Sequence, residues 1–407
     1  MTYEKGANQT MNEKHKVCLI DCADYEQQSI KSAITRIFRL YGGADGIVAL
    51  AGNAKKTKNE TNVLIKPNLV MPCKPEEAVT THPMLVRMIA EEFVSAGYPV
   101  TITDSSGEPH TQEAFQNLYD VTGMTKAAEH SGAKLSYDIT YEDRVIQTKL
   151  NDVAKRTGKK EIPVLKAIAQ ADVIINVAKL KTHGTMFYTG AVKNMYGSVF
   201  SDFKQYYHDV FPDKISFAKM VTDICACMKP TLSIIDGIDG MDSRGPTAGK
   251  IRHAGVLIAS ENPHAADLAA ARVIGFSPGQ MPIMMEGIKR KYIPRKAKKL
   301  KYFGEPPDRF AFKFVPAMMI PAKFGFLPVF IQKKLNEKRM PYPAVIQETC
   351  TGCGKCLKIC PCKTMAMKEN RVMIHYENCI RCYCCHELCP ARAVTFIKEV
   401  KYANKNT

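Results

Sequence analysis

The chain has 407 residues, a formal net charge of +17, 15 cysteines and no tryptophan. Hydrophobic residues make up 45 % and charged residues 24 %, which excludes a disordered chain, a collagen-like repeat and a bundle of membrane spans. The N-terminal residues have no apolar stretch before Val17, so they lack the core of a secretory signal and we expect a cytoplasmic protein. In a reducing compartment this many cysteines favours metal or redox chemistry over disulfides.

Short β-rich runs alternate with helical runs along residues 1–285. Strands are predicted over 16–21, 62–68, 98–107, 172–183, 231–240 and 254–260. Helices are predicted over 27–43, 83–97, 215–228 and 262–274, where apolar residues recur at helical spacing. Strands with continuous apolar cores that alternate with helices indicate an α/β domain. We therefore expect a mostly parallel sheet with helices on both faces.

Residues 286–341 form a basic stretch, which we expect to be a connector. Between Glu286 and Met340 there are 15 Lys or Arg against 4 Asp or Glu. The same stretch contains the apolar segment 310–331, which two lysines and three prolines interrupt. A membrane-spanning helix needs about 20 apolar residues without such breaks, so no transmembrane segment is predicted.

Ten of the 15 cysteines lie between Cys350 and Cys389, within residues 342–400. They form two copies of C-x2-C-x2-C-x3-C-P, the spacing with which bacterial ferredoxins give three thiolates to one 4Fe-4S cluster and the fourth to the other. We expect a small α+β ferredoxin-type domain with two 4Fe-4S clusters. The expected ligands are Cys350, Cys353, Cys356 and Cys389 for one cluster, and Cys379, Cys382, Cys385 and Cys360 for the second.

The alternative to iron–sulfur clusters is structural zinc, which C-x2-C pairs also bind. Zinc does not require the third cysteine or the Cys-Pro ending that both copies contain, so the spacing favours iron–sulfur clusters. Cys362 and Cys384 lie inside the module but outside the ligand pattern, and we expect them to be bystanders.

Polar residues follow several of the predicted strands of the α/β domain. In open α/β sheets ligands bind outside the carboxyl ends of the strands. Such residues singly are common in solvated loops, but together they would suit a small anionic substrate, with lysines as charge partners and a histidine as proton carrier. The candidate catalytic residues are Lys181, His183, Lys193 and Asp104, and the candidate substrate-binding residues are Lys66, Asn68, Ser105, Lys179, Asn194 and Asp236.

Several segments together resemble the domain of unknown function (DUF) family 362. They are KPN at 66–68, THP at 81–83, DSSG at 104–107, KLKTH at 179–183, GAVKN at 190–194, DGIDGMDSRGPTAGK at 236–250 and CIRCYCCHELCP at 379–390. The resemblance implies one α/β domain fused to a two-cluster ferredoxin domain. It also implies that Lys181, His183, Lys193 and Asn194 act together, and it names no substrate.

Three functions compete at this point. The first is an iron–sulfur oxidoreductase, in which the clusters exchange electrons with chemistry in the polar cleft. The second is a non-catalytic electron-transfer or assembly protein that docks an acidic redox partner through the basic connector, because clustered positive charge steers association. The third is nucleic-acid binding through the same basic stretch, which is disfavoured because no recognised nucleic-acid-binding fold accompanies it.

Overall fold

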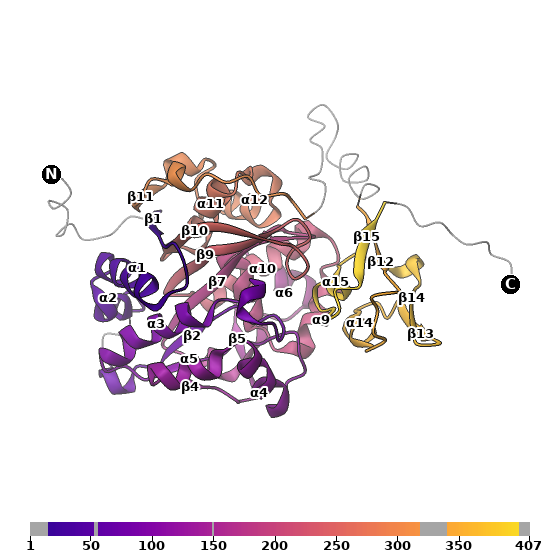
Figure 1. The fold of residues 1–407 in the computed structure, drawn as a ribbon, viewed down its shortest axis with the longest axis horizontal. Coiled ribbons are helices and arrows are strands. Elements are labelled where there is room, and N and C mark those ends of the chain that lie inside the picture. Colours follow the sequence, from indigo (N-terminus) through magenta and orange to yellow (C-terminus); the bar gives the residue numbers. More distant parts are fainter. Residues whose placement is uncertain (1–14, 53–55, 149, 318–339, 399–407) are drawn as a thin grey trace.

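The computed structural model describes residues 15–52, 56–148, 150–317 and 340–398 (Figure 1). A large α/β domain occupies most of the chain, and a smaller module with the clustered cysteines packs beside it. Most of the apolar segment 310–331 lies outside the described residues. Within those four ranges, the structure contains no helix with the length and apolar character to cross a membrane.

The α/β domain is built on one nine-stranded sheet with the order β11-β1-β10-β9-β7-β2-β3-β4, and β8 pairs with β7. Its strands are β1 (Lys16–Asp21), β2 (Val63–Lys66), β3 (Val100–Ile102), β4 (Lys134–Leu135), β7 (Val173–His183), β8 (Phe187–Thr189), β9 (Leu232–Asp242), β10 (Lys250–Ser260) and β11 (Lys301–Gly304). The neighbours from β9 through β7, β2 and β3 to β4 are all parallel. This confirms the predicted mostly parallel sheet.

Two departures from the parallel pattern occur in the chain. β10 is antiparallel to both of its neighbours, β1 and β9, and β8 is antiparallel to β7. A separate antiparallel pair is formed by β5 (Tyr141–Val145) and β6 (Glu161–Leu165). The periodicity of an apolar run locates a strand but contains no information on its direction, which its neighbours decide.

Helices cover both faces of the sheet (Figure 1). They are α1 (Gln27–Leu40), α2 (Gly43–Leu50), α3 (Pro83–Ser95), α4 (Gln112–Val121), α5 (Met124–Ser131), α6 (Asp152–Thr157), α7 (Lys166–Ala169), α8 (Ala191–Asn194), α9 (Ser201–Val210), α10 (Lys214–Met228), α11 (Pro263–Val273) and α12 (Pro282–Lys289). In β1, Cys18 and Ile20 join one core with α1, α3 and α10, whereas Val17 and Leu19 join the other with α11. The alternation of side chains along a strand thus fills two separate cores.

The first part of the predicted connector, 286–341, belongs to the α/β domain. The guanidinium of Arg290 is buried and forms ion pairs with Asp223, Glu286 and Asp152 at 2.5, 2.7 and 2.9 Å. Strand β11 then pairs in parallel with β1 at the edge of the sheet. The connector therefore starts later than residue 286. The prediction placed it there because the stretch is rich in basic residues, but one of these arginines is buried and part of the stretch forms a strand.

The C-terminal module has the small α+β fold expected for a ferredoxin-type domain. Strands β12 (Tyr342–Val345) and β15 (Val394–Ile397) form one antiparallel pair, and β13 (Met365–Lys368) and β14 (Arg371–Ile374) form another. Short helices α14 (Lys355–Ile359) and α15 (Cys384–Glu387) follow the two cysteine loops. In Figure 1 the module lies beside α9 of the large domain.

Candidate functional site

The predicted site residues meet where β2, β3 and β7 end, because these parallel strands run in the same direction. Lys66, the last residue of β2, lies with its Nζ 2.6 Å from Oδ1 of Asp104, and both side chains are buried. The other oxygen of Asp104 accepts the backbone N–H of Leu69 at 2.8 Å. Gly197 faces this ion pair, and a Cβ there would lie 2.7 Å from the lysine Nζ. The pair therefore joins three loops with no room for a larger side chain.

A chain of amide hydrogen bonds links Lys181 to the end of β2. Its ammonium donates to Oδ1 of Asn68 at 2.7 Å and to the carbonyl of Val79 at 2.6 Å. The Asn68 amide donates in turn to Asn194 at 3.1 Å, and that of Asn194 to Asn176 at 2.8 Å. Burial, assisted by the charge of Lys193, lowers the pKa of Lys181 to about 7. A lysine with a pKa in this range can exchange a proton near neutral pH.

Helix α8 positions Lys193 and Asn194 at the site. Its first two N–H groups, of Ala191 and Val192, donate to the carboxylate of Asp267 at 2.6 and 3.0 Å. Burial raises the pKa of Asp267 to about 7, although these two N–H groups oppose that rise. Lys193 is partly exposed, and its amine has no hydrogen-bond or ion-pair partner in the described part of the chain.

His183, at the end of β7, faces a residue of the ferredoxin module. Its Nδ1 accepts the backbone N–H groups of Thr185 and Met186 at 3.2 and 3.3 Å, which leaves the ring proton on Nε2. Nε2 lies 2.7 Å from Oε1 of Glu387 in α15. Burial lowers the pKa of His183, so the ring is neutral. Burial opposes ionisation of Glu387, yet His183 and Lys193 hold its pKa well below the usual value for a carboxyl group.

Further contacts hold the ferredoxin module against the site. Leu388 packs against Met71, Cys73, Val79 and Met241, and a Cβ at Gly107 would lie 2.6 Å from its Cδ2. Lys355 pairs with Glu108 at 2.8 Å, and Arg392 pairs with Glu77. The predicted site is therefore covered by the module.

Lys179 and Asp236 form a second network beside the first. Their side chains lie 3.0 Å apart in neighbouring strands. The hydroxyl of Tyr25 accepts from Lys179 and donates to Asp236, at 2.8 Å each, and its ring stacks on His82 at 3.7 Å. The two residues are thus close to the other candidates but bonded to a different set.

Ser105 contacts three residues that were not among the candidates. Its hydroxyl lies 3.0 Å from Nε2 of His110 and donates to the carbonyl of Val199 at 2.8 Å. Lys204 of α9 donates to the carbonyls of Ser105 and Ser106. Burial lowers the pKa of Lys204 to about 7.

Sequence reasoning missed the side chains that come to the site from outside its motifs. They are Tyr25, Lys204, His208, Asp267 and Glu387, whereas His82 lies in the THP segment but was given no role. The only signal for Glu387 is an acid between two predicted cluster ligands, and nothing in that pattern indicates a contact with β7. Lys204 and His208 lie in α9, Asp267 lies in α11 and Tyr25 lies in the loop before α1, and none of these positions belongs to a quoted motif.

Two cavities in the module match the predicted cluster ligands. Around the first lie Cys350, Cys353, Cys356 and Cys389. Around the second lie Cys360, Cys379, Cys382 and Cys385, together with Cys362 and Cys384. Backbone N–H groups donate to Sγ of Cys389 at 3.2 Å and of Cys360 at 3.3 Å. Four thiols around one cavity, with N–H groups directed at sulfur, fit a 4Fe-4S cluster.

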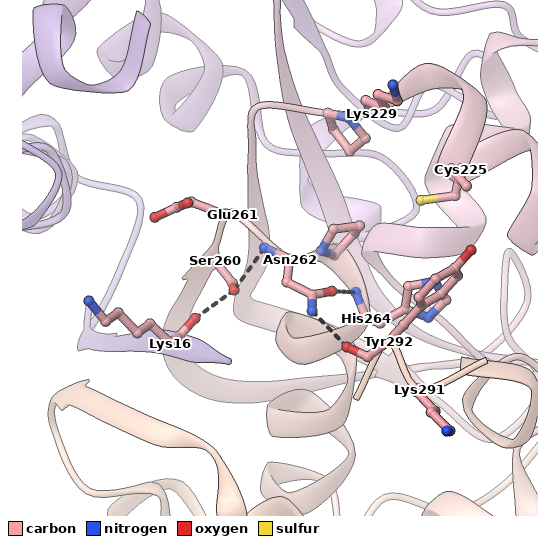
Figure 2. A pocket seen from close by; sticks show the side chains of 12 residues that line it. Lys16, Cys225, Lys229, Ser260, Glu261, Asn262, His264, Lys291 and Tyr292 are labelled. Carbon is pink, nitrogen blue, oxygen red and sulfur yellow. Dashed lines mark hydrogen bonds between the residues drawn. The ribbon is translucent and has the colours of Figure 1, made fainter. Parts of the chain in front are cut away.

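A different pocket lies at the other end of the strands, near the start of β1 and β9 (Figure 2). No candidate site residue lines it. At its centre Asn262 caps α11 by accepting the N–H of His264 at 3.0 Å, and its amide donates to the carbonyl of Tyr292 at 2.9 Å. The amines of Lys16, Lys229 and Lys291 lie at its periphery in Figure 2. Its central polar groups therefore already bond to one another.

The turn that contains Lys298 and Lys299 lies far from the ferredoxin module. Lys298 and Lys299 belong to a single turn that directly precedes β11. β11 is the edge strand of the sheet, and Figure 1 shows it well separated from β12 to β15. A partner docked on this turn would not face the cysteine cavities.

Known proteins resemble parts of this chain. The thylakoid-associated protein sll1697 of Synechocystis is 24 % identical over 312 residues, which cover 76 % of this chain and 90 % of that protein. The apoprotein of lactate racemase from Thermoanaerobacterium thermosaccharolyticum aligns with 64 % of this chain and 57 % of its own, at a TM-score of 0.39 and 15 % identity. A protein from Thermotoga maritima aligns with 62 % of this chain and 59 % of its own, at a TM-score of 0.35 and 12 % identity.

Two family models match, in agreement with the resemblance seen in the sequence. Residues 343–390 match the 4Fe-4S dicluster domain, which establishes two 4Fe-4S clusters as cofactors and electron transfer as the role of the module. Residues 63–272, just over half of the chain, match the domain of unknown function DUF362. The protein therefore belongs to the DUF362 family and carries a 4Fe-4S dicluster domain.

Proposed function

We propose that the protein is an iron–sulfur oxidoreductase that exchanges electrons with a small anionic substrate at the polar edge of the α/β sheet. The ligands of one cluster are, in this proposal, Cys350, Cys353, Cys356 and Cys389, and those of the second Cys379, Cys382, Cys385 and Cys360. When bound, such clusters supply single electrons at potentials that the protein environment tunes.

The observation that carries this proposal is the position of Glu387. It contacts His183, and it is two residues from Cys385 of one quartet and two residues from Cys389 of the other. Two residues span at most about 7 Å. An electron on either cluster therefore has a short path to the polar site.

Within this site we propose that Lys181, His183 and Lys193 act on the substrate. Lys193 supplies positive charge for an anionic group, because no acid pairs with its amine in the described ranges. Lys181 exchanges a proton near neutral pH, and His183 holds a proton on Nε2 at the entrance from the module. Asp104, which was a catalytic candidate, is fully engaged by Lys66 and the Leu69 N–H and positions the loops instead.

The substrate-binding candidates divide into two groups under the same proposal. Asn68 orients Lys181 by accepting its ammonium, and Asn194 holds Asn68 by accepting its amide. The remaining candidates shape the surrounding loops through their own bonds, and they are Lys66, Ser105, Lys179 and Asp236.

The test is anaerobic reconstitution of both clusters, chemical reduction, and mixing with a panel of small carboxylates and phosphate esters. Reoxidation of the clusters is followed by visible absorption and the product by mass spectrometry. Lys193→Gln is expected to slow reoxidation by substrate, whereas the matched control Lys126→Gln, an exposed lysine of α5, is expected to leave it unchanged. Protein that holds both clusters but neither binds nor turns over any anion contradicts the proposal.

A cytoplasmic location is part of the proposal, since a reducing compartment keeps cluster thiols available. The relative from Synechocystis is named as thylakoid-associated. The test therefore compares the amount of this protein in the membrane fraction with the amount in the supernatant. Fractionation of cells is expected to recover the protein in the supernatant. Recovery with membranes after a high-salt wash would contradict this part.

A further inference from the structure

The entrance of the polar site contains His183, Lys193 and His208 of the α/β domain and one acid of the ferredoxin module, Glu387. The neutral His183 ring donates from Nε2 to Oε1 of Glu387 at 2.7 Å, and the positive charge of Lys193 acts on the same carboxylate. The Glu387 side chain is only 16 % exposed. Charge and the exclusion of water therefore hold this carboxylate in the same way that they would hold a bound ligand.

The acids of the α/β domain itself do not neutralise this entrance. Asp104 is engaged by Lys66, and Asp236 by Lys179 and Tyr25. Removal of Glu387 would therefore leave the Nε2 proton of His183 without its acceptor, and the charge of Lys193 without the carboxylate on which it acts. Such a place favours any carboxylate that can reach it.

We propose that Glu387 is a built-in occupant of the carboxylate subsite for the substrate, and that a small carboxylate substrate binds there by displacing it. This rests on the proposed function, whose polar site it deepens by naming the substrate class. Leu388 follows Glu387 in the chain, so the displacement also lifts Leu388 from Met71, Cys73 and Val79. Substrate binding thereby loosens the contact between the ferredoxin module and the site.

The exchange is energetically feasible because one carboxylate replaces another. A tethered group competes at an effective concentration of roughly millimolar. A free carboxylate must therefore exceed that concentration or make additional contacts, for example with Lys181. The measured dissociation constant equals the intrinsic one divided by the fraction of molecules in which Glu387 has left.

Cys73 provides a readout of this displacement that needs no redox turnover. Its thiol is buried in the apolar cluster against which Leu388 packs. The probe is glutarate, which carries carboxylates on a glutamate-sized chain, and the neutral isostere glutaramide is the control ligand. Alkylation of Cys73 by iodoacetamide, read by peptide mass spectrometry, is expected to accelerate several-fold with glutarate and not with glutaramide. Cys225, buried in α10, is the internal control.

Glu387→Gln keeps the shape of the side chain and removes its charge. It is expected to bind glutarate roughly ten- to a hundredfold more tightly by calorimetry, because the competitor is lost. The matched control is Glu377→Gln, an exposed acid equally close to a proposed cluster ligand, which is expected to bind like the wild type. Iron content confirms that the clusters are retained in both variants.

The outcomes separate this inference from the proposed function. Unchanged glutarate affinity in Glu387→Gln, weaker affinity, or alkylation of Cys73 that does not respond to glutarate would each overturn it. If Glu387→Gln does not fold, His183→Gln takes its place, and it must accelerate Cys73 alkylation without ligand. If glutarate displaces Glu387 but the reduced protein transfers electrons to no substrate, this inference stands and the oxidoreductase proposal is contradicted.

Discussion

The second cavity of the ferredoxin module is lined by six cysteines, although a 4Fe-4S cluster takes four. The spacing assigns Cys360, Cys379, Cys382 and Cys385 to the cluster and leaves two bystanders. Cys362 and Cys384 are therefore expected to be replaceable by Ala without loss of iron. In contrast, replacing any one proposed ligand with Ala is expected to reduce the iron content from about eight atoms per chain to about four.

Pairs of substitutions decide whether the two motifs exchange their fourth ligand. Cys353 and Cys389 line the same cavity, so replacing both with Ala removes one cluster and leaves about four irons. Cys353 and Cys360 line different cavities, so that double variant loses both clusters. If each motif instead held its own cluster, the two results would be reversed.

The assay is anaerobic reconstitution, removal of loose iron, and colorimetric iron per chain. Circular dichroism on each sample shows whether the α/β domain, which has its own core, remains folded. Retention of about four irons in the Cys353 and Cys360 double variant would refute the exchanged ligation. A fall to about four irons in Cys384→Ala would refute the choice of ligands within the second cavity.

Three further predictions concern the polar site. Lys66→Met is expected to lower the free energy of unfolding in urea by about 3–5 kcal/mol, because it leaves Asp104 buried without a partner. The double variant Lys66→Met with Asp104→Asn should recover most of that loss. An equal loss in the single and the double variant would contradict the prediction. Gly197→Ala is expected to cost about 1–3 kcal/mol in the same assay by crowding the ion pair, and an unchanged midpoint would refute the close packing. The pKa of Lys181 falls from 10.5 to about 7 on folding, so between these values the unfolded chain binds the extra proton. The stability of the wild type relative to Lys181→Met should therefore rise with pH across that range, by up to about 1.4 kcal/mol per pH unit, whereas parallel curves would contradict it.

Local patterns were sufficient for much of the fold because they depend on residues close together in the chain. The apolar runs located β1, β2, β7, β9 and β10, and the amphipathic runs located α1, α3, α10 and α11. The direction of β10 and the position of β11 could not be predicted in this way. β11 is placed by its pairing with β1, a contact between residues more than 200 positions apart, and β10 turns back beside β9 and also pairs with the distant β1.

The polar site shows the same division. Strand ends identified Lys66, Asp104 and Lys181 as neighbours, because the carboxyl ends of parallel strands lie at one end of the sheet. Which of them bond to each other depended on side-chain directions along β7, where a register shift between Lys179 and Lys181 sends them to different networks. That shift leaves no mark in the sequence.

The cysteine spacing by itself determined the cofactor of the module, since a cluster imposes fixed distances on ligands a few residues apart. Composition alone also suggested a globally basic protein, although the largest excess of basic residues lies between Glu286 and Met340. Only the tertiary structure brought Glu387 to His183 and Leu388 to Gly107. No local pattern encodes these contacts, because they arise from the docking of two separately folded units whose surfaces become complementary only once each has formed.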